Sequence, residues 1–573
     1  MKLILRYIKK YKIEAVLAPL FKMTEALLEL FVPLVIAAII DNKIPAADYS
    51  GIIKHSLILL ALGFAGLAFS ATAQYLSARA AVRTAADIKS ALFKHISGFS
   101  YTQLDKIGAA TLITEMTSDI NLVQSGINLT LRLFLRSPFI VFGAMIMAFT
   151  IDSREALIFA VMIAILSLIV FTVMGVTVPR HRKVQRGLDA LTLSVRENVN
   201  GARVIRAFRS ERSETEKFDI KNSALNKMQV AVARITSLTN PLTLVVVNIA
   251  VAVLLKIGAV KVFDGDLSAG AVVALYNYLT QILVELVKLA NLIVSITKSI
   301  AGADRIETVF GITPDYESGA LTEIDSECKT AISFENVSFK YDGSSEYSLE
   351  DISFTLNKGQ TLGIIGSTGS GKSTLVNLLA AFYKADSGVI KFFGHPVESY
   401  NSEFLHSALG FCAQKAVLFK GSIRDNMKIG KPDATDGEII SALKTAQAFD
   451  FVNEKPGFLD FELEENARNL SGGQKQRLTL ARALVKRPLV FISDDCSSAL
   501  DLATDARLRK ALSELDDITK IIVSQRVSAV ISSDKILVLE DGAAVGFGTH
   551  SELVENCDVY KEIYLSQIGK EAD

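Results

Sequence analysis

One glycine-rich segment of the chain has the residue types and the spacing that bind phosphate. Residues 366–373 read GSTGSGKS, directly after an apolar run at 361–365, and fit the pattern GxxxxGK[ST]. Glycines let consecutive backbone N–H groups point at phosphate oxygens, and a helix that starts here adds partial positive charge. Lys372 is expected to reach the terminal phosphates, and the Ser373 hydroxyl can ligate Mg²⁺. The predicted chemistry is binding of a nucleotide with its magnesium ion.

A second motif supplies a carboxylate for that ion. Residues 489–494 read LVFISD, an apolar run that ends in Asp494. A buried strand of this kind delivers its last residue to the edge of a sheet, beside the phosphate loop. An acid at the end of a strand is weak evidence alone, but here it follows the phosphate loop in the required order.

Further motifs resemble those of the ABC-type ATPases. LSGGQ at 470–474, followed by KQR, is similar to that family's signature, and SALD at 498–501 is similar to its D-loop, which ends in Asp501. Tyr341 in VSFKY resembles the aromatic residue that stacks on adenine, and Gln414 in GFCAQ resembles the Q-loop glutamine. Because the motifs also stand in the family's order, coincidence is a poor explanation.

The resemblance implies ATP and Mg²⁺ as the cofactors, with the metal held by Ser373, Gln414 and Asp494. It also implies that each ATP lies between one chain's phosphate loop and the signature of a second chain, where a serine hydroxyl and glycine N–H groups can clamp the γ-phosphate. The residues expected to bind nucleotide are Tyr341, Gly366, Ser367, Thr368, Gly369, Ser370, Gly371, Lys372, Ser373, Thr374, Gln414 and Asp494. The residues expected to complete the partner's site are Leu470, Ser471, Gly472, Gly473 and Gln474.

Two catalytic positions depart from the family pattern. The family's general base after the magnesium aspartate is normally glutamate, but here it is Asp495. The missing methylene draws the carboxylate back by roughly 1 Å, which is expected to cost about 10²-fold or more in rate. The family's switch histidine is replaced by Gln525, which can donate a hydrogen bond but cannot carry a positive charge. We expect this chain to bind ATP and hydrolyse it slowly; the alternative is that both substitutions are tolerated.

The elements that position these motifs are predicted to form an α/β domain at residues 331–573. Two runs read as antiparallel strands and three more as buried strands, with helical stretches between them, which is typical of a largely parallel central sheet. The predicted strands are Ala331–Ser338, Tyr347–Leu356, Thr361–Ile365, Leu489–Ser493 and Lys520–Ser524.

The first 300 residues are predicted to be an all-α membrane domain. The chain is 50% apolar, and the excess is concentrated in six runs that each approach or exceed the ~20 residues needed to cross a ~30 Å hydrocarbon core. The runs are Ile13–Ile40, Ile52–Tyr75, Leu133–Thr150, Ala156–Val178, Pro241–Val262 and Ala269–Ile296. Membrane spans explain such runs better than six buried helices of a soluble domain.

Basic residues in the connections predict the orientation of the spans. They are few in the short connections at 41–51, 151–155 and 261–270 and numerous on the other side. By the positive-inside rule, both termini and the long loops near 80–132 and 179–240 are cytoplasmic. Residues 1–12 are predicted to form a basic interfacial helix, and 301–330 a linker.

The layout of the whole chain resembles that of ABC exporter half-transporters: a six-helix transmembrane domain at 1–300, the linker, and the ATP-binding domain. The resemblance implies a multi-pass protein of a bacterial cytoplasmic membrane that pairs with a second half-transporter. Segments 100–108 and 205–214 resemble the coupling helices that rest on the ATP-binding domains. An intact signature beside an impaired site favours a heterodimer whose other half carries the glutamate and the histidine.

Polar side chains within the predicted spans are the only sequence evidence on the cargo. Glu29 and Glu285 are candidate cargo contacts, since ionisable groups inside a membrane are usually functional. Lys22 with Glu25, and Glu285 with Lys288, are three residues apart on helices and can pair with each other instead. The expected cargo is an amphipathic small molecule, a lipid or a peptide.

Composition bears on whether the chain binds nucleic acid and on the compartment in which its C-terminal half lies. The 61 basic and 61 acidic residues leave no net charge and give no bulk reason to bind nucleic acid. The four cysteines lie in the C-terminal half without metal-ligand spacing, which favours a reducing compartment there. A homodimeric lipid flippase and an ATP-gated membrane switch stay as alternatives. The two substitutions argue against the flippase, and the intact signature, which implies a hydrolysing partner, argues against the switch.

Overall fold

The computed structural model describes residues 2–313 and 319–571; the side chains of residues 290, 291 and 568–571 lie outside that description. Contacts between residues divide the chain into two units. Unit 1 comprises residues 1–97 and 110–313, and unit 2 comprises residues 98–109 and 314–573. The segment 98–109 therefore packs with the C-terminal unit, although its neighbours in sequence belong to unit 1.

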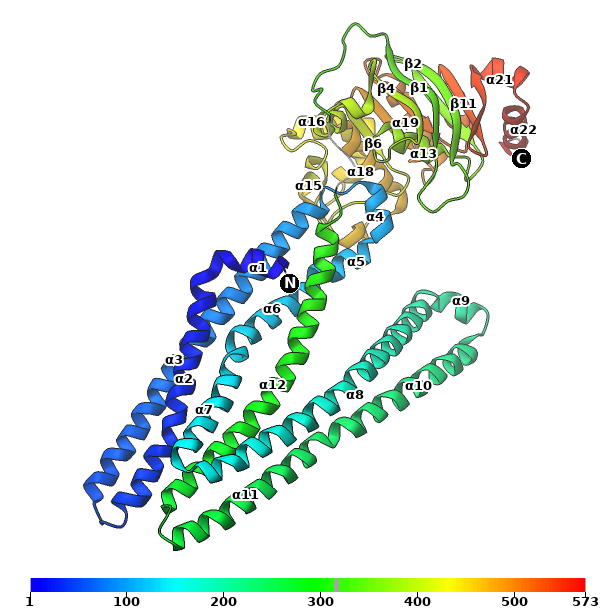
Figure 1. The fold of residues 1–573 in the computed structure, drawn as a ribbon. Helices are drawn as coiled ribbons and strands as arrows, with labels where there is room; N and C mark the ends of the chain where they lie inside the picture. The colour runs from blue at the N-terminus through cyan, green and yellow to red at the C-terminus, as the bar shows by residue number, and fades with distance from the viewer. Residues whose placement is uncertain (1, 314–318, 572–573) are drawn as a thin grey trace. The chain divides into compact units, whose positions relative to one another are not determined.

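Unit 1 is built from long helices (Figure 1). Its elements are α1 (Lys2–Ile8), η1 (Lys9–Tyr11), α2 (Lys12–Ala38), η2 (Ile39–Lys43), α3 (Tyr49–Ile96), α5 (Ala109–Thr114), η3 (Glu115–Asp119), α6 (Ile120–Leu129), η4 (Thr130–Phe134), α7 (Arg136–Ile151), α8 (Ser153–Asn200), α9 (Ala202–Ala207), α10 (Glu211–Ser237), α11 (Thr239–Phe263) and α12 (Ala269–Phe310). Helix α4 (Tyr101–Ile107) belongs to unit 2.

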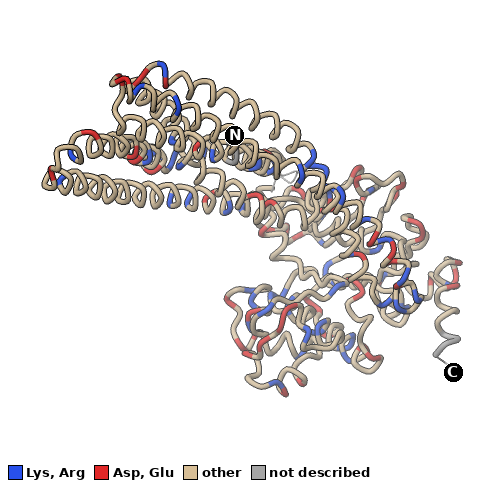
Figure 2. The backbone as a smooth tube through the Cα atoms, turned by 90° about the horizontal axis from the view of Figure 1, so that it is seen from below, with Lys and Arg blue, Asp and Glu red and all other residues tan. Residues whose placement is uncertain are grey.

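Six helical stretches of the described residues are long and apolar enough to cross a membrane, which confirms the number of predicted spans. Figure 2 shows long uncharged stretches along these helices. The stretches are Lys2–Lys43, Tyr49–Ile96, Ala109–Ile151, Ser153–Asn200, Glu211–Phe263 and Ala269–Phe310. Each extends beyond its apolar run, so the predicted long loops are mostly helical continuations of the spans. The hairpin of α8, α9 and α10 shows this clearly (Figure 1).

The core of unit 1 lies where α2, α7, α8, α11 and α12 meet. Small residues such as Ala144 and Ala156 are fully buried there, which lets the helices approach closely. Tyr278 of α12 is also buried, and its hydroxyl donates a hydrogen bond to the carbonyl of Leu30 in α2 at 2.6 Å. This bond satisfies a polar group that would be costly to leave unpaired in an apolar environment.

The predicted linker begins later than expected. Helix α12 continues to Phe310, so the first ten residues of the segment 301–330 are helical. Ala303, Ile306 and Val309 are buried on one face of that helix at a spacing of three residues. The polar residues between them occupy the other face, and this is why composition alone suggested a linker.

Unit 2 contains two main sheets. A six-stranded sheet has the order β12-β11-β3-β10-β9-β6, and all its neighbouring strands are parallel except β12. A four-stranded antiparallel sheet has the order β2-β1-β4-β5. The strands are β1 (Thr330–Phe339), β2 (Leu349–Asn357), β3 (Thr361–Gly366), β4 (Ser387–Phe392), β5 (His395–Pro396), β6 (Leu409–Cys412), β7 (Gly421–Ser422), β8 (Glu462–Leu463), β9 (Val490–Asp494), β10 (Thr519–Val523), β11 (Lys535–Glu540) and β12 (Ala543–Gly548). The five predicted strands and the parallel sheet are confirmed.

Helices lie between and after these strands, and some of them begin at motif residues. They are α13 (Lys372–Leu379), α14 (Ser402–Ala408), α15 (Ile423–Lys428), α16 (Asp436–Thr445), α17 (Phe449–Asn453), α18 (Gly472–Leu484), α19 (Leu502–Ser513), α20 (Val527–Val530), α21 (His550–Asn556) and α22 (Asp558–Glu571), with the short turns η5 (Val397–Ser399), η6 (Phe458–Asp460) and η7 (Glu465–Ala467). In the sheet, Val523 of β10 pairs with Ile364 of β3 on one side and with Asp494 of β9 on the other. This register brings the ends of three strands together at one edge.

Candidate functional site

The phosphate loop connects β3 to α13, as predicted. Gly371 stands immediately before α13 with φ = 93°, in the left-handed region that favours glycine. A Cβ atom at this position would lie 2.5 Å from the carbonyl oxygen of Ser348. The final glycine of the loop is therefore required both by the backbone conformation and by the close approach of the neighbouring chain.

Lys372 is largely buried and lies over the phosphate loop. Its Nζ atom donates to the carbonyl of Gly366 at 2.9 Å and also bonds to the Ser367 carbonyl and the Ser370 hydroxyl. Burial lowers the pKa of the ammonium, while the carboxylates of Asp494 and Asp495 oppose the shift. This geometry places a positive charge where the terminal phosphates of a nucleotide would lie.

Ser373 and Asp494 meet beside that lysine. The Ser373 hydroxyl donates to Asp494 Oδ1 at 3.0 Å, and burial raises the pKa of the Asp494 carboxyl. A hydroxyl and a carboxylate at this distance form part of the oxygen donor set that Mg²⁺ prefers, so the two residues fit the implied ion. Gln414 lies on the surface, and its side chain hydrogen-bonds to Asp495.

Asp495 lies beyond the end of β9 and next to this pair. Its N–H donates to the carbonyl of Val523 at 3.0 Å, and its φ is 48°, a left-handed conformation that asparagine and aspartate adopt more readily than most residues. Burial raises the pKa of its carboxyl, against the opposing charges of Arg526 and Lys372. A carboxylate with a raised pKa binds a proton more readily, which suits a general base.

Gln525 lies in the loop between β10 and α20, and its side chain is exposed. The loop begins where the backbone N–H of Ser524 donates to the carbonyl of Ile364 at 3.0 Å, in the strand that leads to the phosphate loop. The carbonyl of Gln525 itself accepts a hydrogen bond from Gln567 Nε2 at 2.8 Å. No sequence motif revealed this contact between Gln567 of α22 and the loop that carries Gln525.

Tyr341 follows β1 by two residues and contacts the start of α13. Its hydroxyl lies 3.2 Å from Thr374 Oγ1, one residue after the proposed magnesium ligand Ser373. Phe339 and Tyr383 pack edge-on against its ring at centroid distances of 5.0 Å and 5.3 Å. The ring is thus held beside the first turn of α13, the helix that follows the phosphate loop.

The signature residues lie at the start of α18, where Leu470 is buried and Gly473 and Gln474 are partly buried. The Ser471 hydroxyl accepts from the N–H of Gln474 at 3.3 Å, and Gln474 Oε1 accepts from the N–H of Ser471 at 3.0 Å. Ser471 and Gly472 are exposed, and no hydrogen bond in the described part of the chain joins the signature to the phosphate loop. Asp501 caps α19 by accepting from the N–H of Thr504 at 2.9 Å, which lowers its pKa.

Helix α4 is part of unit 2 and matches the first predicted coupling segment. The ring of Tyr101 stacks on Phe382 at a centroid distance of 4.6 Å, and the Tyr383 hydroxyl donates to Asp105 Oδ2 at 2.7 Å. Because Tyr383 also packs against Tyr341, one side chain touches both α4 and the candidate adenine-stacking residue. The second predicted segment, at 205–214, covers the end of α9 and the start of α10.

Both candidate cargo residues are engaged by one arginine in unit 1. Arg136 Nη1 donates to Glu285 Oε1 at 2.6 Å, and its Nη2 donates to Glu29 Oε2 at 2.8 Å. Glu285 also accepts from Ser137 at 2.8 Å and from Lys288 at 2.9 Å, while Lys22 pairs with Glu25 as predicted. Sequence reasoning missed Arg136. The available signal was a charge within the run at 133–150 that has no oppositely charged neighbour three or four residues away.

A cavity of about 270 Å³ in unit 1 borders this charge network. Its polar lining includes Glu29, Glu285, Gln281 and Lys288. The Glu29 side chain is 41% exposed and that of Glu285 only 4%. Glu29 is thus the more accessible of the two to a molecule in the cavity, whereas Glu285 is buried against Arg136 and Ser137 of α7.

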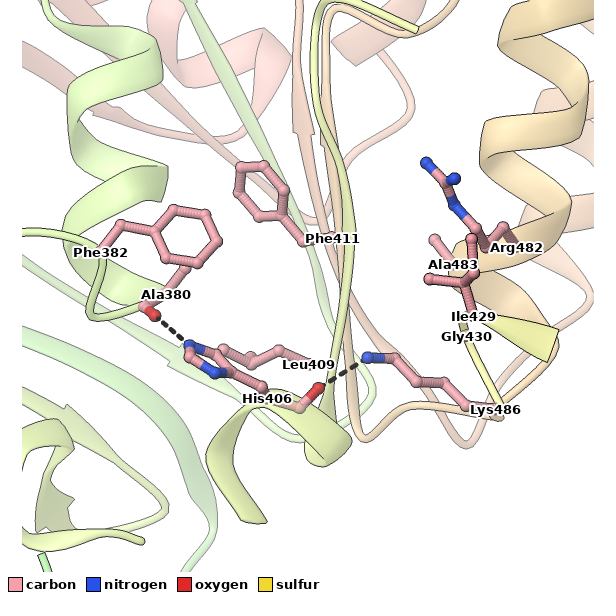
Figure 3. A pocket seen from close by; sticks show the side chains of 10 residues that line it. All are labelled: Ala380, Phe382, His406, Leu409, Phe411, Ile429, Gly430, Arg482, Ala483 and Lys486. Carbon is pink, nitrogen blue, oxygen red and sulfur yellow. Dashed lines mark hydrogen bonds between the residues drawn. The ribbon is translucent and has the colours of Figure 1, made fainter. Parts of the chain in front are cut away.

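A smaller cavity of about 190 Å³ lies in unit 2 (Figure 3). Figure 3 shows Lys486 and His406 on its wall: Lys486 Nζ donates to the carbonyl of His406 at 2.6 Å, and a ring nitrogen of His406 bonds to the carbonyl of Ala380 at 3.0 Å. Burial lowers the pKa of Lys486 to about 8. This pocket is lined by none of the motif residues.

Comparison with known proteins agrees with this geometry. The family described as the ABC transporter transmembrane region matches residues 16–286, and the family described as ABC transporter matches residues 349–498. The ABC transporter ATP-binding protein YfiB of Bacillus subtilis is 33% identical over 99% of this chain and 98% of its own length. A similarly named protein of Mycobacterium tuberculosis is 30% identical over 99% of this chain and 98% of its own. The chain belongs to the ABC transporters, with a membrane domain and an ATP-binding ABC domain in one polypeptide.

Two further similarities bear on fold and function. A solved bacterial Atm1-family ABC exporter with ATP bound superposes with a TM-score of 0.81 over 98% of both chains at 20% identity, which shows the shared fold. YgaD of Bacillus subtilis, an ATP-binding/permease protein whose name proposes multidrug export, is 29% identical over 99% of both chains.

Proposed function

We propose that this chain is one half of a heterodimeric exporter that moves amphipathic molecules out across a bacterial cytoplasmic membrane. Its own phosphate loop binds ATP and hydrolyses it slowly, while its signature completes the catalytic site of a second half-transporter. That partner carries glutamate and histidine at the positions of Asp495 and Gln525.

The observation that carries this proposal is the contrast between two parts of unit 2. Asp495 and Gln525 occupy loops that follow the adjacent strands β9 and β10, next to the phosphate loop. Asp495 is shorter than the family's glutamate, and Gln525 cannot carry the positive charge of the family's histidine. The signature at the start of α18 is complete, and its Ser471 and Gly472 are exposed. A chain with an impaired phosphate-loop site and an intact signature can still complete a catalytic site in a partner whose own phosphate-loop site is competent.

The residues of this site have separable tasks in ATP binding. Lys372 and the N–H groups of the phosphate loop neutralise and orient the phosphates, and Tyr341 stacks on the base. Ser373 and Asp494 would hold Mg²⁺, which, when bound, neutralises charge on the phosphates. Asp495 accepts a proton from an attacking water less effectively, because its shorter side chain leaves the carboxylate farther from that water. Gln525 donates a hydrogen bond to the γ-phosphate without supplying charge.

Coupling to the membrane domain is proposed to run through α4. ATP-driven dimer closure would move unit 2 and, through the contacts of Tyr101 and Asp105, would move α4 with it. Because α3 directly precedes α4 in the chain, that movement would reach α3. Closure of this kind can rotate the spans between inward-open and outward-open arrangements. The slow site could hold the dimer partly closed while the partner's site cycles, since binding alone shifts a conformational equilibrium.

The proposed cargo class comes from the cavity beside Glu29 and from the relatives. The cavity has apolar walls, including Val32, Ile36 and Ile140, and a few polar groups, which suits an amphipathic molecule. The name of YgaD points to multidrug export, and we extend that to this chain as part of the proposal. Both termini and the long helical extensions are proposed to be cytoplasmic, from the distribution of basic residues.

The test uses the tagged chain purified with its partner from membranes of its native host. Asp495→Asn in this chain should change the ATPase rate of the complex by less than about twofold, because this site contributes little turnover. Ser471→Ala should lower the rate by at least about tenfold, since it removes a γ-phosphate contact from the productive site. Ser513→Ala is the matched control, because its hydroxyl donates to the Lys510 carbonyl within α19.

The reverse pattern would overturn the proposal. If Asp495→Asn abolishes turnover while Ser471→Ala leaves it intact, this chain's own site is the productive one.

A further inference from the structure

The C-terminal helix holds the loop that carries Gln525 by its backbone. Gln567 lies in α22, and its Oε1 accepts a hydrogen bond from the N–H of Val527 at 2.8 Å. Its Nε2 donates to the carbonyl of Gln525, also at 2.8 Å. One side-chain amide thus bridges the loop much as the peptide group of a neighbouring strand would.

On its opposite side, the loop that carries Gln525 is hydrogen-bonded to the segment that carries Asp495. Arg526 Nη2 donates to the carbonyl of Ser498 at 3.3 Å, and its N–H donates to the Ser524 hydroxyl at 3.0 Å. The charge of Arg526 also faces Asp495. The loop is therefore held between α22 on one side and the chain after β9 on the other.

Helix α22 is itself fixed in a core shared with the phosphate loop. Tyr560 is fully buried in one apolar cluster with Val527 and Ile365, and its hydroxyl lies 2.8 Å from His550 Nδ1. Ile365 immediately precedes the phosphate loop, and Val527 begins α20 directly after the loop that carries Gln525. A single core thus supports the phosphate strand, that loop and α22.

We propose that Gln567 is a positioning residue that sets where Gln525 points and so controls how long ATP stays in this chain's site. The amide is suited to the task because the loop offers one donor, the Val527 N–H, and one acceptor, the Gln525 carbonyl. A carboxylate would keep only the first bond, and an apolar side chain would keep neither. The inference rests on the proposed placement of Gln525 at the γ-phosphate and does not depend on the partner's identity.

The test compares Gln567→Met, which conserves side-chain size but cannot form the two bonds, with Gln567→Glu and the unchanged chain. Ser566→Ala is the matched control on the same helix, because the Ser566 hydroxyl bonds to the Ile563 carbonyl within α22. The full chain is reconstituted in lipid nanodiscs. Hydrogen exchange of the peptide that covers 525–530 reports on the loop, and the release rate of a fluorescent ATP analogue reports on the site.

We expect Gln567→Met to speed exchange of the Val527 amide by about fivefold or more, the effect of losing one net hydrogen bond. It should speed release of the ATP analogue by a similar factor. Gln567→Glu should keep the Val527 amide protected yet still speed release, because only the bond to the Gln525 carbonyl is lost. Ser566→Ala should change neither quantity.

Two results would overturn the positioning role. Unchanged exchange in Gln567→Met would mean that the bridge does not hold the loop. Faster exchange with unchanged release would mean that the bridge is only structural. Failure of the proposed nucleotide site gives a different signature, since the unchanged chain and Lys372→Ala would then bind the ATP analogue equally.

Discussion

At the scale of residues, the chemistry of the ATP site depends on side-chain reach. The carboxylate of Asp495 is one methylene shorter than that of a glutamate, and it extends from a backbone with φ = 48° directly after β9. The type and order of the motif residues could be read from the sequence because each has a fixed chemical task. The contact of Gln414 with Asp495 could not, since it depends on how two loops meet.

The lowered pKa of Lys486 predicts that the free energy of unfolding depends on pH between about 8 and 10. Its pKa is about 8 in the folded chain and about 10.4 in an unfolded one, so between these values the unfolded state binds more protons. The free energy of unfolding should therefore rise as pH increases from about 8 to about 10, and this contribution should be lost as pH falls through 8. Thermal unfolding of the chain at pH 7.5 and 9.5 measures it.

Lys486→Met serves as the comparison for that experiment, because methionine has a similar volume and no charge. We expect the variant to be more stable than the unchanged chain at pH 7.5 and to gain less on moving to pH 9.5. An equal gain in both proteins would show that another group causes the dependence.

At the scale of elements, α4 is the seven-residue segment through which coupling is proposed to run. Its N-terminus is fixed by Ser100 and Gln103, each of which bonds to the other's backbone N–H. The resemblance of segment 100–108 to a coupling helix located the element, but sequence could not reveal its partners. Phe382 and Tyr383 lie nearly 300 residues away and belong to no motif.

Tyr383→Phe tests whether α4 transmits the state of the ATP site. The substitution removes only the hydroxyl that donates to Asp105 and retains the ring that packs on Tyr341. ATP binding should stay within about twofold of normal, while stimulation of ATPase activity by a transported compound should fall several-fold, because one charge-assisted hydrogen bond is lost. Unchanged stimulation would place the coupling elsewhere.

Arg136→Met should destabilise unit 1 strongly. The substitution leaves Glu285, whose side chain is 4% exposed, without its main counter-charge, and breaking a buried pair typically costs about 3–5 kcal/mol. The temperature at which the detergent-solubilised protein loses its monodisperse elution peak should drop markedly. Arg136→Met combined with Glu285→Gln should recover part of that loss, since no uncompensated charge is then buried.

Lys288→Met is the matched control for this network, because the Lys288 side chain is 45% exposed and pairs with the same glutamate. Its effect should be small. An Arg136→Met variant as stable as Lys288→Met would contradict the structural role of the arginine.

Helix boundaries show where sequence patterns are informative. The apolar runs located all six spans because burial in lipid demands about 20 consecutive apolar residues. The continuation of α12 to Phe310 was missed because a half-buried helix needs only one apolar face. The buried positions Ala303, Ile306 and Val309 already marked that face in the sequence.

At the scale of the whole molecule, the order of the two domains followed directly from composition and motifs. Pairing between residues distant in sequence did not: the Arg136 network joins α2, α7 and α12, and Gln567 joins the last helix to the loop after β10. Such contacts depend on three-dimensional packing, which a local pattern does not encode.

The proposed membrane orientation predicts opposite labelling of two exposed positions. In cells, Asp266→Cys, between α11 and α12, should react with a membrane-impermeant maleimide. Arg212→Cys, at the start of α10, should react only after lysis, since the proposed orientation places the basic side of the protein in the cytoplasm. Labelling of Arg212→Cys in intact cells would reverse the orientation.

The most direct test of the heterodimer compares ATPase activity of this chain alone in lipid nanodiscs with that of the complex purified with its partner. Because Asp495 and Gln525 replace the family's glutamate and histidine, we expect the chain alone to bind ATP but to hydrolyse it about 10²-fold more slowly than the complex. Comparable activity of the chain alone would contradict that account. It would show that Asp495 and Gln525 support hydrolysis and that the exporter works as a homodimer.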